Sequence, residues 1–200
     1  MALNFANNNS LSAITTKPSG LSGGAMTLLS TQTASSSSTI SFTSGIDSTY
    51  DEYVFKFYNI HPSTDEVYFT FQTSTNTGSS YGVSLTSTYF HAYHGEGGAG
   101  GALAYDDTMD QANGTGEQRL LYALGNGSDE SASGTLQLFN PSSTTFVKHY
   151  MSNCNWYHYN NFSFNARTAG YFNTTSAIDA IRFSISSGTF DGDICLYGIA

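Results

Sequence analysis

The chain has 200 residues and a formal net charge of −9, and charged residues make up only 10% of it. An acidic chain this poor in Lys and Arg repels phosphate backbones and anionic lipid surfaces, so we expect it to bind neither nucleic acid nor membranes. It also contains 14 Tyr and 14 Phe. Aromatic and β-branched residues favour pleated, half-buried surfaces, which predicts an all-β protein with a weakly charged surface.

Residues 1–25 are rich in Asn, Ser and Gly and predict an extended N-terminal arm without a core of its own. Four apolar side chains are scattered through this arm: Leu3, Phe5, Leu11 and Ile14. A structureless tail carries fewer apolar side chains, so we expect these four to contact a neighbouring protein. The arm lacks the basic head and apolar stretch of a signal peptide, so we expect the protein to fold in the cytoplasm where it is made.

Residues 26–200 predict one antiparallel β-sandwich domain, jelly-roll-like, with about nine or ten short strands separated by turns. The clearest alternation of apolar and polar side chains runs over 53–60 and 66–73. Because a five-residue turn, 61–65, connects these two runs, they predict a β-hairpin. A second hairpin is expected further on, around the turn at 140–143.

The segments between and after the hairpins are less uniform. Residues 95–101 include five glycines and predict a flexible loop, and 104–116 predict a long polar loop. Residues 118–124 fit either a strand or one helical turn. Residues 178–186 and 194–199 predict the last two strands.

The cysteines and the first histidine cluster have structural interpretations that compete with functional ones. Cys154 and Cys195 are the only cysteines, and in a reducing compartment we expect two free, buried thiols, although one bridge between them is an alternative. His91, His94 and Glu96 form the most metal-like cluster. A zinc site needs three or four convergent ligands, whereas His91 and His94 point to opposite faces of a strand, so we favour a polar strand end and expect no metal.

The loop at 104–116 contains oxygen-bearing side chains that a calcium ion could use: Asp106, Asp107, Asp110 and Asn113. Their spacing does not match a calcium-binding loop, and a solvated acidic loop is the preferred interpretation. The sequence shows no nucleophile elbow and no phosphate-binding loop. We therefore expect no cofactor and no enzymatic activity, with a carboxylate-based carbohydrate-active enzyme as a third alternative.

The stretch Trp156, Tyr157, His158 and Tyr159 lies among asparagines. Exposed aromatic rings beside amides are typical of surfaces that bind sugars or proteins, because the rings give a large contact area at low entropic cost. The alternative is that half of these side chains face the core, as the alternation of a strand requires. Both interpretations remain open from the sequence, and the four residues are contact candidates.

Five segments carry a resemblance that extends over most of the chain: 45–50 (GIDSTY), 52–62 (EYVFKFYNIHP), 133–145 (with LFNPSSTT), 173–177 (NTTSA) and 187–199 (with SGTFDGDI and LYGI). They resemble short virion structural proteins of tailed phages that infect marine bacteria, including cyanobacteria. These motifs are hairpins and turns rather than catalytic signatures, so no active-site residue is carried over from the family.

The resemblance implies a component of a phage particle that is made in the cytoplasm of a bacterial host. We expect a decoration or cement protein of the head, whose arm and exposed aromatic residues bind the major capsid protein or copies of the chain, with a homotrimer favoured. The alternative is a tail fibre or receptor-binding adhesin that contacts tail components and host surface glycans. The long polar loops and the stretch from Trp156 to Tyr159 motivate this alternative.

Overall fold

The computed structural model describes residues 25–98 and 100–199, and this part of the chain consists of strands and loops without a helix. The all-β prediction is therefore confirmed. Within these ranges no helix is present that could cross a membrane. The strands in chain order are β1 (Met26–Ser37), β2 (Thr39–Phe42), β3 (Glu52–Pro62), β4 (Val67–Ser74), β5 (Leu85–Gly95), β6 (Gly101–Tyr105), β7 (Gln118–Leu124), β8 (Ala132–Phe139), β9 (Lys148–His158), β10 (Phe162–Phe172), β11 (Ala180–Ile185) and β12 (Phe190–Ile199).

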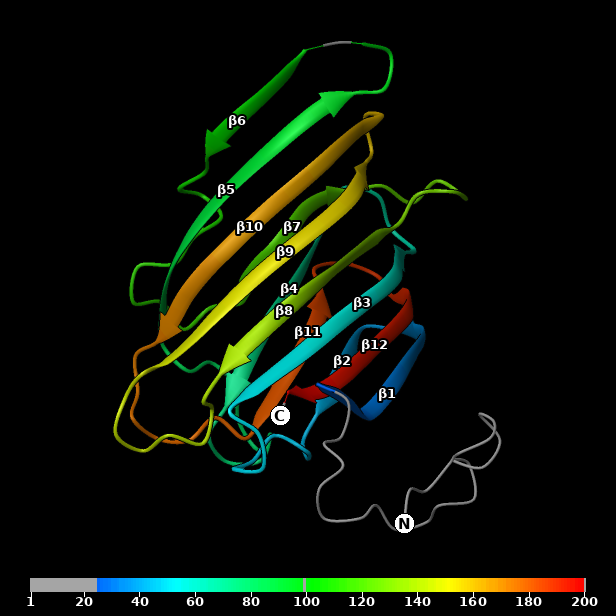
Figure 1. Cartoon of the computed structure of the whole chain (residues 1–200). Coiled ribbons are helices and arrows are strands. Elements are labelled where there is room, and N and C mark those ends of the chain that lie inside the picture. The colour runs from blue at the N-terminus through cyan, green and yellow to red at the C-terminus, as the bar shows by residue number, and fades with distance from the viewer. Residues whose placement is uncertain (1–24, 99, 200) are drawn as a thin grey trace, which may run out of the picture.

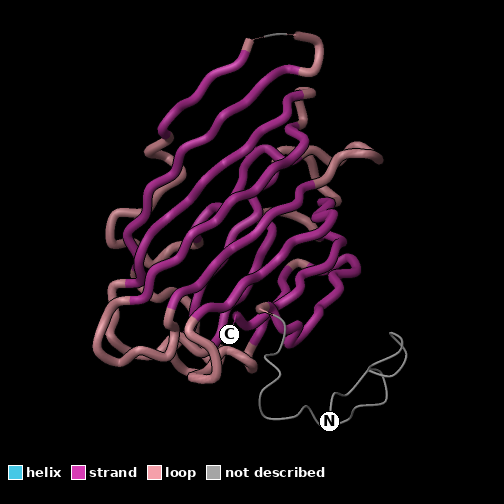
Figure 2. The backbone as a smooth tube through the Cα atoms, in the orientation of Figure 1, coloured by secondary structure: helices cyan, strands magenta, loops and turns pink. Residues whose placement is uncertain are grey.

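These strands form one antiparallel sheet that bends back on itself and nearly closes, as the ribbon shows (Figure 1). The main path runs β1-β12-β3-β8-β9-β7-β4-β11-β2. Three further strands continue from β9 in the order β10-β5-β6, and we call them the front extension. Figure 2 shows the two parts of the sheet. The front strands lie side by side in the order β1-β12-β3-β8-β9-β10-β5-β6, and the rear strands β7, β4, β11 and β2 lie behind them.

The sheet passes from front to rear at a narrow junction between β9 and β7. Only one residue pair joins these two strands, Leu124 with His158, whereas β9 and β10 are paired along their full length. The front extension therefore branches from the main path at β9.

The core lies between the front and rear strands and is rich in phenylalanine. The ring of Phe183 on β11 is its centre, with centroid distances of 5.1–6.3 Å to the rings of Phe42, Phe55, Phe57 and Phe69. All five rings are buried. Edge-to-face and stacked contacts of this kind stabilise a core beyond the burial of area alone.

The hairpin expected from 53–60 and 66–73 is wrong, although the inward faces of both runs are correct. β3 pairs with β12 and β8, whereas β4 pairs with β11 and β7. Phe57 and Phe69 meet across the core at 5.3 Å between ring centroids instead of lying on neighbouring strands. The short connection therefore carries the chain from the front strands to the rear strands.

Of the other predictions about strands, the second hairpin is confirmed and the number of strands is wrong. The second hairpin is confirmed, because β8 and β9 pair from Phe139 with His149 to Ala132 with Trp156. Residues 118–124 form a strand, β7. The expected nine or ten strands are too few, partly because β6 lies where loops were expected. The residues on both sides of β6 are typical of turns and loops, so composition alone does not reveal a five-residue strand between them.

The prediction for the two cysteines can be compared with the structure, whereas the prediction for the N-terminal arm cannot. Cys154 and Cys195 are free and buried, as expected. The arm lies outside the described residues except for Ala25, and so do its contact candidates, which are Leu3, Phe5, Leu11 and Ile14.

Candidate functional site

The aromatic stretch near the end of β9 is divided between the core and the surface. Trp156 and His158 are buried, at 2% and 9% exposure, because they share the inward face of β9. Of the two interpretations left open by the sequence, the burial pattern agrees with the one in which half of the stretch faces the core. Tyr157 and Tyr159 remain half-buried at the surface, where they stay contact candidates.

Tyr157, near the end of β9, is held by one acceptor from the connection between β5 and β6 and one from the turn between β9 and β10. Its hydroxyl lies 2.7 Å from a carboxylate oxygen of Glu96 and 3.3 Å from the side-chain oxygen of Asn161. The bond to Glu96 raises the pKa of Tyr157 to about 12, so the phenol remains a donor at neutral pH.

The histidine cluster on β5 is also divided by the strand. His91 is buried among aromatic rings, whereas His94 is exposed on the opposite face. Within the described ranges, no three His, Cys, Asp or Glu side chains converge to hold a metal ion. His91 belongs to the core rather than to the polar strand end that the sequence indicated.

The oxygens of the acidic loop hold the loop itself together. Asp106 accepts bonds from the backbone N–H of Thr108 at 3.0 Å and from its hydroxyl at 2.7 Å. Asp110 accepts a bond from the hydroxyl of Tyr105. Asn113 accepts from the hydroxyl of Ser84 at 2.6 Å. These bonds fix the conformation of the loop and tie it to the segment before β5.

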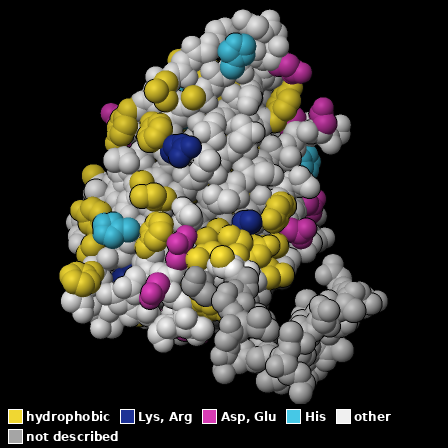
Figure 3. Space-filling view, viewed as in Figure 1, with side chains coloured by type: hydrophobic (Ala, Val, Ile, Leu, Met, Phe, Trp, Pro, Cys, Tyr) yellow, Lys and Arg dark blue, Asp and Glu magenta, His cyan; other side chains and the backbone are white. Residues whose placement is uncertain are grey.

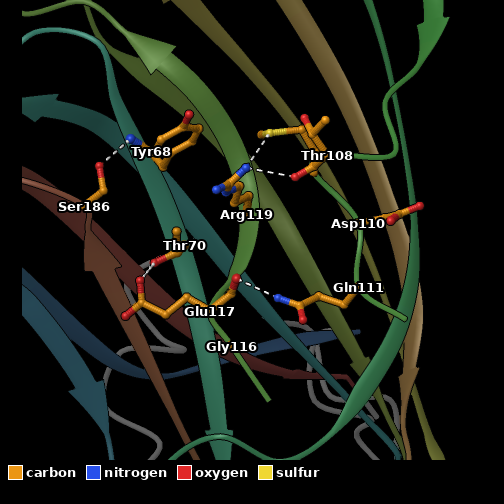
Figure 4. A pocket seen from close by; sticks show the side chains of 10 residues that line it. Tyr68, Thr70, Thr108, Asp110, Gln111, Gly116, Glu117, Arg119 and Ser186 are labelled. Atoms are coloured by element: carbon orange, nitrogen blue, oxygen red, sulfur yellow. Dashed lines mark hydrogen bonds between the residues drawn. The ribbon is translucent and has the colours of Figure 1, made fainter. Parts of the chain in front are cut away.

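A polar groove lies where this loop covers the outer face of β4 and β7. It has a volume of about 470 Å³, and Figure 4 shows its walls. Tyr68 and Thr70 come from the outward positions of β4, and Arg119 from β7. The opposite wall comes from the loop, with Thr108, Met109, Asp110, Gln111, Gly116 and Glu117, and Ser186 closes one end. Strand alternation thus supplies one wall and the acidic loop the other.

A cation, a carboxylate and an aromatic ring face this groove together. The guanidinium of Arg119 lies 4.3 Å from the ring centroid of Tyr68, and its Nη1 donates to the carbonyl of Thr108 at 2.9 Å. A carboxylate oxygen of Glu117 accepts a hydrogen bond from the hydroxyl of Thr70 at 2.9 Å. The amide of Gln111 donates to the backbone carbonyl of Glu117 at 3.0 Å. Donors and acceptors of this density suit a ligand rich in hydroxyl groups.

A second arginine–tyrosine stack lies on the same outer face, one strand further along. The guanidinium of Arg182 on β11 is 4.4 Å from the ring centroid of Tyr81. Its Nη2 donates to the side-chain oxygen of Gln72, on β4, at 2.6 Å. Two of the six Lys and Arg residues of an acidic chain are therefore concentrated on these three rear strands.

The outer face of the front strands is different, because large apolar side chains are exposed on it. Figure 3 shows hydrophobic side chains scattered over this face among polar surface, with a small number of charged side chains between them. Five of them lie on β5, β6, β9 and β10, and these form what we call the apolar face: Phe90 (41% exposed), Leu103 (74%), Tyr105 (58%), Met151 (54%) and Tyr171 (36%). A second hollow of about 420 Å³ lies nearer β3 and β8, where Tyr58 and Asn153 are among its lining residues.

Sequence reasoning missed both the groove and the apolar face. The alternation in 66–73 already places Tyr68 outward, so one wall was visible in the sequence. The second wall was not, because nothing local shows that the acidic loop folds back onto β4 and β7.

No family model, curated protein or solved structure matches this chain.

Proposed function

We propose that this chain is a non-enzymatic structural protein of a tailed-phage virion, and most specifically a decoration or cement protein on the capsid surface. The observation that carries the proposal is the apolar face, which exposes five large side chains on strands that form a broad, weakly charged surface. Contiguous exposed apolar patches mark sites that bind other proteins, and we propose that these five side chains form one such patch. The sequence resemblance supplies the class of particle.

In this proposal the apolar face docks on the major capsid protein, and the arm (residues 1–25) adds a second attachment. Leu3, Phe5, Leu11 and Ile14 are the arm residues that we propose to enter capsid or neighbouring-subunit grooves. The jelly-roll-like form of a sandwich is proposed for the domain over 26–200, and a trimer remains the oligomer expected from the sequence. The protein is made in the cytoplasm of the host and functions in the virion.

The experiment that tests this proposal is cryo-electron microscopy of the intact particle, with this chain traced into the density. We expect density distributed over the lattice of the head. Tyr171→Ser is expected to lower incorporation into particles about tenfold, because burying one large apolar side chain contributes about 1.5–3 kcal/mol. Phe146→Ser is the control, since Phe146 is 71% exposed on a loop outside the apolar face. Density confined to the tail would contradict the proposal.

The second candidate is a tail fibre or receptor-binding adhesin for host surface glycans, and the polar groove favours it. Tyr68 offers a ring face, and Arg119 and Glu117 offer a donor and an acceptor within the same 470 Å³ space. Sugars are bound by this combination of an aromatic plane and paired polar groups.

Binding of the purified protein to host cells and to their isolated polysaccharide tests this second candidate. Arg119→Ala is expected to abolish the binding, whereas Arg167→Ala is the control because Arg167 is exposed on β10, on the front face. Equal loss in both variants, or no binding by the unmodified protein at high concentration, would count against a glycan site in the groove.

A further inference from the structure

The outermost strand of the front extension, β6, has one edge that no strand of the described residues covers. Among the described strands it pairs with β5 alone, and Figure 1 shows it at the margin of the molecule. The pairing runs without a register shift from Phe90 with Tyr105 to His94 with Gly101. Leu103, in the middle of β6, is 74% exposed and is the most exposed large apolar side chain of the described residues.

The hydrogen-bond pattern fixes which backbone groups point outward from this edge. The N–H of Asp106 donates to the carbonyl of Tyr89 on β5 at 3.0 Å. In an antiparallel pair the residues alternate between those bonded to the neighbouring strand and those facing away from it. Counting back from Asp106, the N–H and C=O groups of Gly101, Leu103 and Tyr105 therefore face away from β5.

Natural edge strands are usually protected from pairing by charged side chains, prolines or bulges. The segment 97–105 has the sequence Gly-Gly-Ala-Gly-Gly-Ala-Leu-Ala-Tyr, without a charge or a proline. β6 and β5 are paired without a bulge. An edge with none of these protections is suited to pairing with a further strand.

We propose that this edge pairs antiparallel with β6 of a second copy of the chain, about a two-fold axis at Leu103. The three outward-facing residues then match themselves: Leu103 exchanges both backbone bonds with Leu103 of the second copy, and Gly101 lies opposite Tyr105. The ring of Tyr105 covers the glycine across the new pair, which is a known way of stabilising a glycine in a strand. Phe90, opposite Tyr105 on β5, extends the same apolar strip.

The charges near β6 favour this antiparallel arrangement over a parallel one. The acidic residues Asp106, Asp107 and Asp110 all follow the C-terminal end of the strand. With the axis at Leu103, Asp106 of the two copies lie six positions apart, which is roughly 20 Å along the strands. This is about twice the screening length at physiological salt, so the repulsion is small. Parallel pairing would bring the two acidic clusters together.

The contact is short, and its expected strength follows from its size. Stable interfaces bury about 1,200–2,000 Å² in total, which a pair of five-residue edges does not reach alone. We therefore expect a weak dimer in solution that strengthens at high local concentration. The trimer expected from the sequence is a different assembly, because a ring of three needs two different surfaces on each subunit. The inference does not depend on the proposed virion function.

Sedimentation velocity of the full chain over a wide concentration range tests the pairing. We expect a concentration-dependent dimer, and at least a tenfold weaker association for Leu103→Lys, which places a charge at the edge. Phe146→Lys is the matched control, because it makes the same change at a similarly exposed side chain away from β6, and it should associate like the unmodified chain. Thermal unfolding checks that both variants are folded.

Disulfide trapping locates the contact independently. Directly opposed residues in a bonded antiparallel pair have Cα atoms about 5.5 Å apart, within the range that a disulfide spans. Leu103→Cys is expected to form a reducible covalent dimer under mild oxidation, and Phe146→Cys is expected not to. The native cysteines are buried and do not interfere.

Three results would overturn the proposal. The first is a monomer at every concentration with no trapped dimer. The second is a dimer or trimer that Leu103→Lys leaves unchanged, because another surface would then hold the copies together. The third is a monomer that dimerises through β6 only after removal of residues 1–24, because that segment of the chain would then be the occupant of the edge.

Discussion

Gly134 lies on β8 opposite Cys154 of β9, at a position with no room for a side chain. A Cβ atom at this position would lie 2.7 Å from the carbonyl oxygen of Asn153 and 2.7 Å from the sulfur of Cys154. The Cα of Cys154 would also lie 2.8 Å away, and this atom and the carbonyl oxygen of Asn153 belong to the backbone of β9, so they cannot move without shifting that strand. The glycine is therefore required by packing rather than by an unusual backbone angle.

Gly134→Ala is expected to lower the free energy of unfolding by about 1–3 kcal/mol, the usual cost of overpacking a tight site. Gly97→Ala makes the same chemical change where no atom lies within 4 Å of the added methyl group, and its effect should stay within about 0.5 kcal/mol. Urea denaturation of the two variants measures both values. Equal stabilities would show that β8 and β9 separate easily.

At the scale of the element, Lys148 binds two loops at one end of the β9–β10 pair, the loop before β9 and the loop after β10. Its side chain is buried, and Nζ donates to the carbonyls of Ser143 at 3.1 Å, Phe146 at 3.3 Å and Thr174 at 2.9 Å. Burial lowers the pKa of this ammonium group. Three carbonyl oxygens thus take the place of water around one charge.

Lys148→Met keeps the length of the side chain and removes all three bonds, so about 1–3 kcal/mol of stability should be lost as the carbonyls are left without donors. Amide hydrogen exchange should become faster at 143–147 and 173–177. Lys56→Met is the comparison, because Lys56 lies over the ring of Tyr197 at 5.2 Å and is only half-buried. Unchanged exchange in both loops would refute the fastening role.

The elements also show what sequence reasoning can supply and where it stops. A period of two identifies the buried face of a strand, which is why the inward positions of Phe57 and Phe69 were predictable. It does not identify the neighbouring strand, because a short connection serves a hairpin and a crossing between front and rear equally well. At Trp156 the period required half of the stretch to be buried, but only the register with β8 and β10 decides which half.

At the scale of the whole molecule, an aromatic cluster joins the front extension to the rear of the sheet. Tyr122 on β7 and Phe164 on β10 are its centre, and both contact two buried histidines. His91 on β5 lies 5.6 Å and 5.4 Å from these two rings, and His158 on β9 lies 5.9 Å and 4.7 Å from them, between centroids. The front extension is joined to β9 by the full-length pairing of β10, and this cluster packs it against β7 as well.

Both histidines are held in their neutral form. Burial lowers the pKa of His91 below 6.5, and the charge of Asp106 opposes this only in part. Burial likewise lowers the pKa of His158, against the opposing charges of Glu66 and Asp65. The backbone N–H of Asn160 donates to Nδ1 of His158 at 3.2 Å, a bond that requires this nitrogen to be unprotonated.

The sign of the pH dependence follows from these lowered values. Between the pKa of the unfolded chain, 6.5, and the lower pKa of the folded state, the unfolded chain binds more protons, so acid favours unfolding. Stability contributed by the neutral histidines is complete above pH 6.5 and is lost as the pH falls below it. The pKa of Asp47 is lowered from 3.8 by hydrogen bonds from Thr49, so this carboxylate acts at lower pH than this window.

Urea denaturation at several pH values between 7 and 5 measures this slope. His91→Phe should flatten it, because phenylalanine preserves the aromatic packing and cannot bind a proton. His94→Phe changes the same residue type on the exposed face of the same strand and should leave the slope as it is. If His91→Phe kept the full slope, the acid sensitivity would come from groups outside the cluster, and the front extension would be attached independently of the charge on His91.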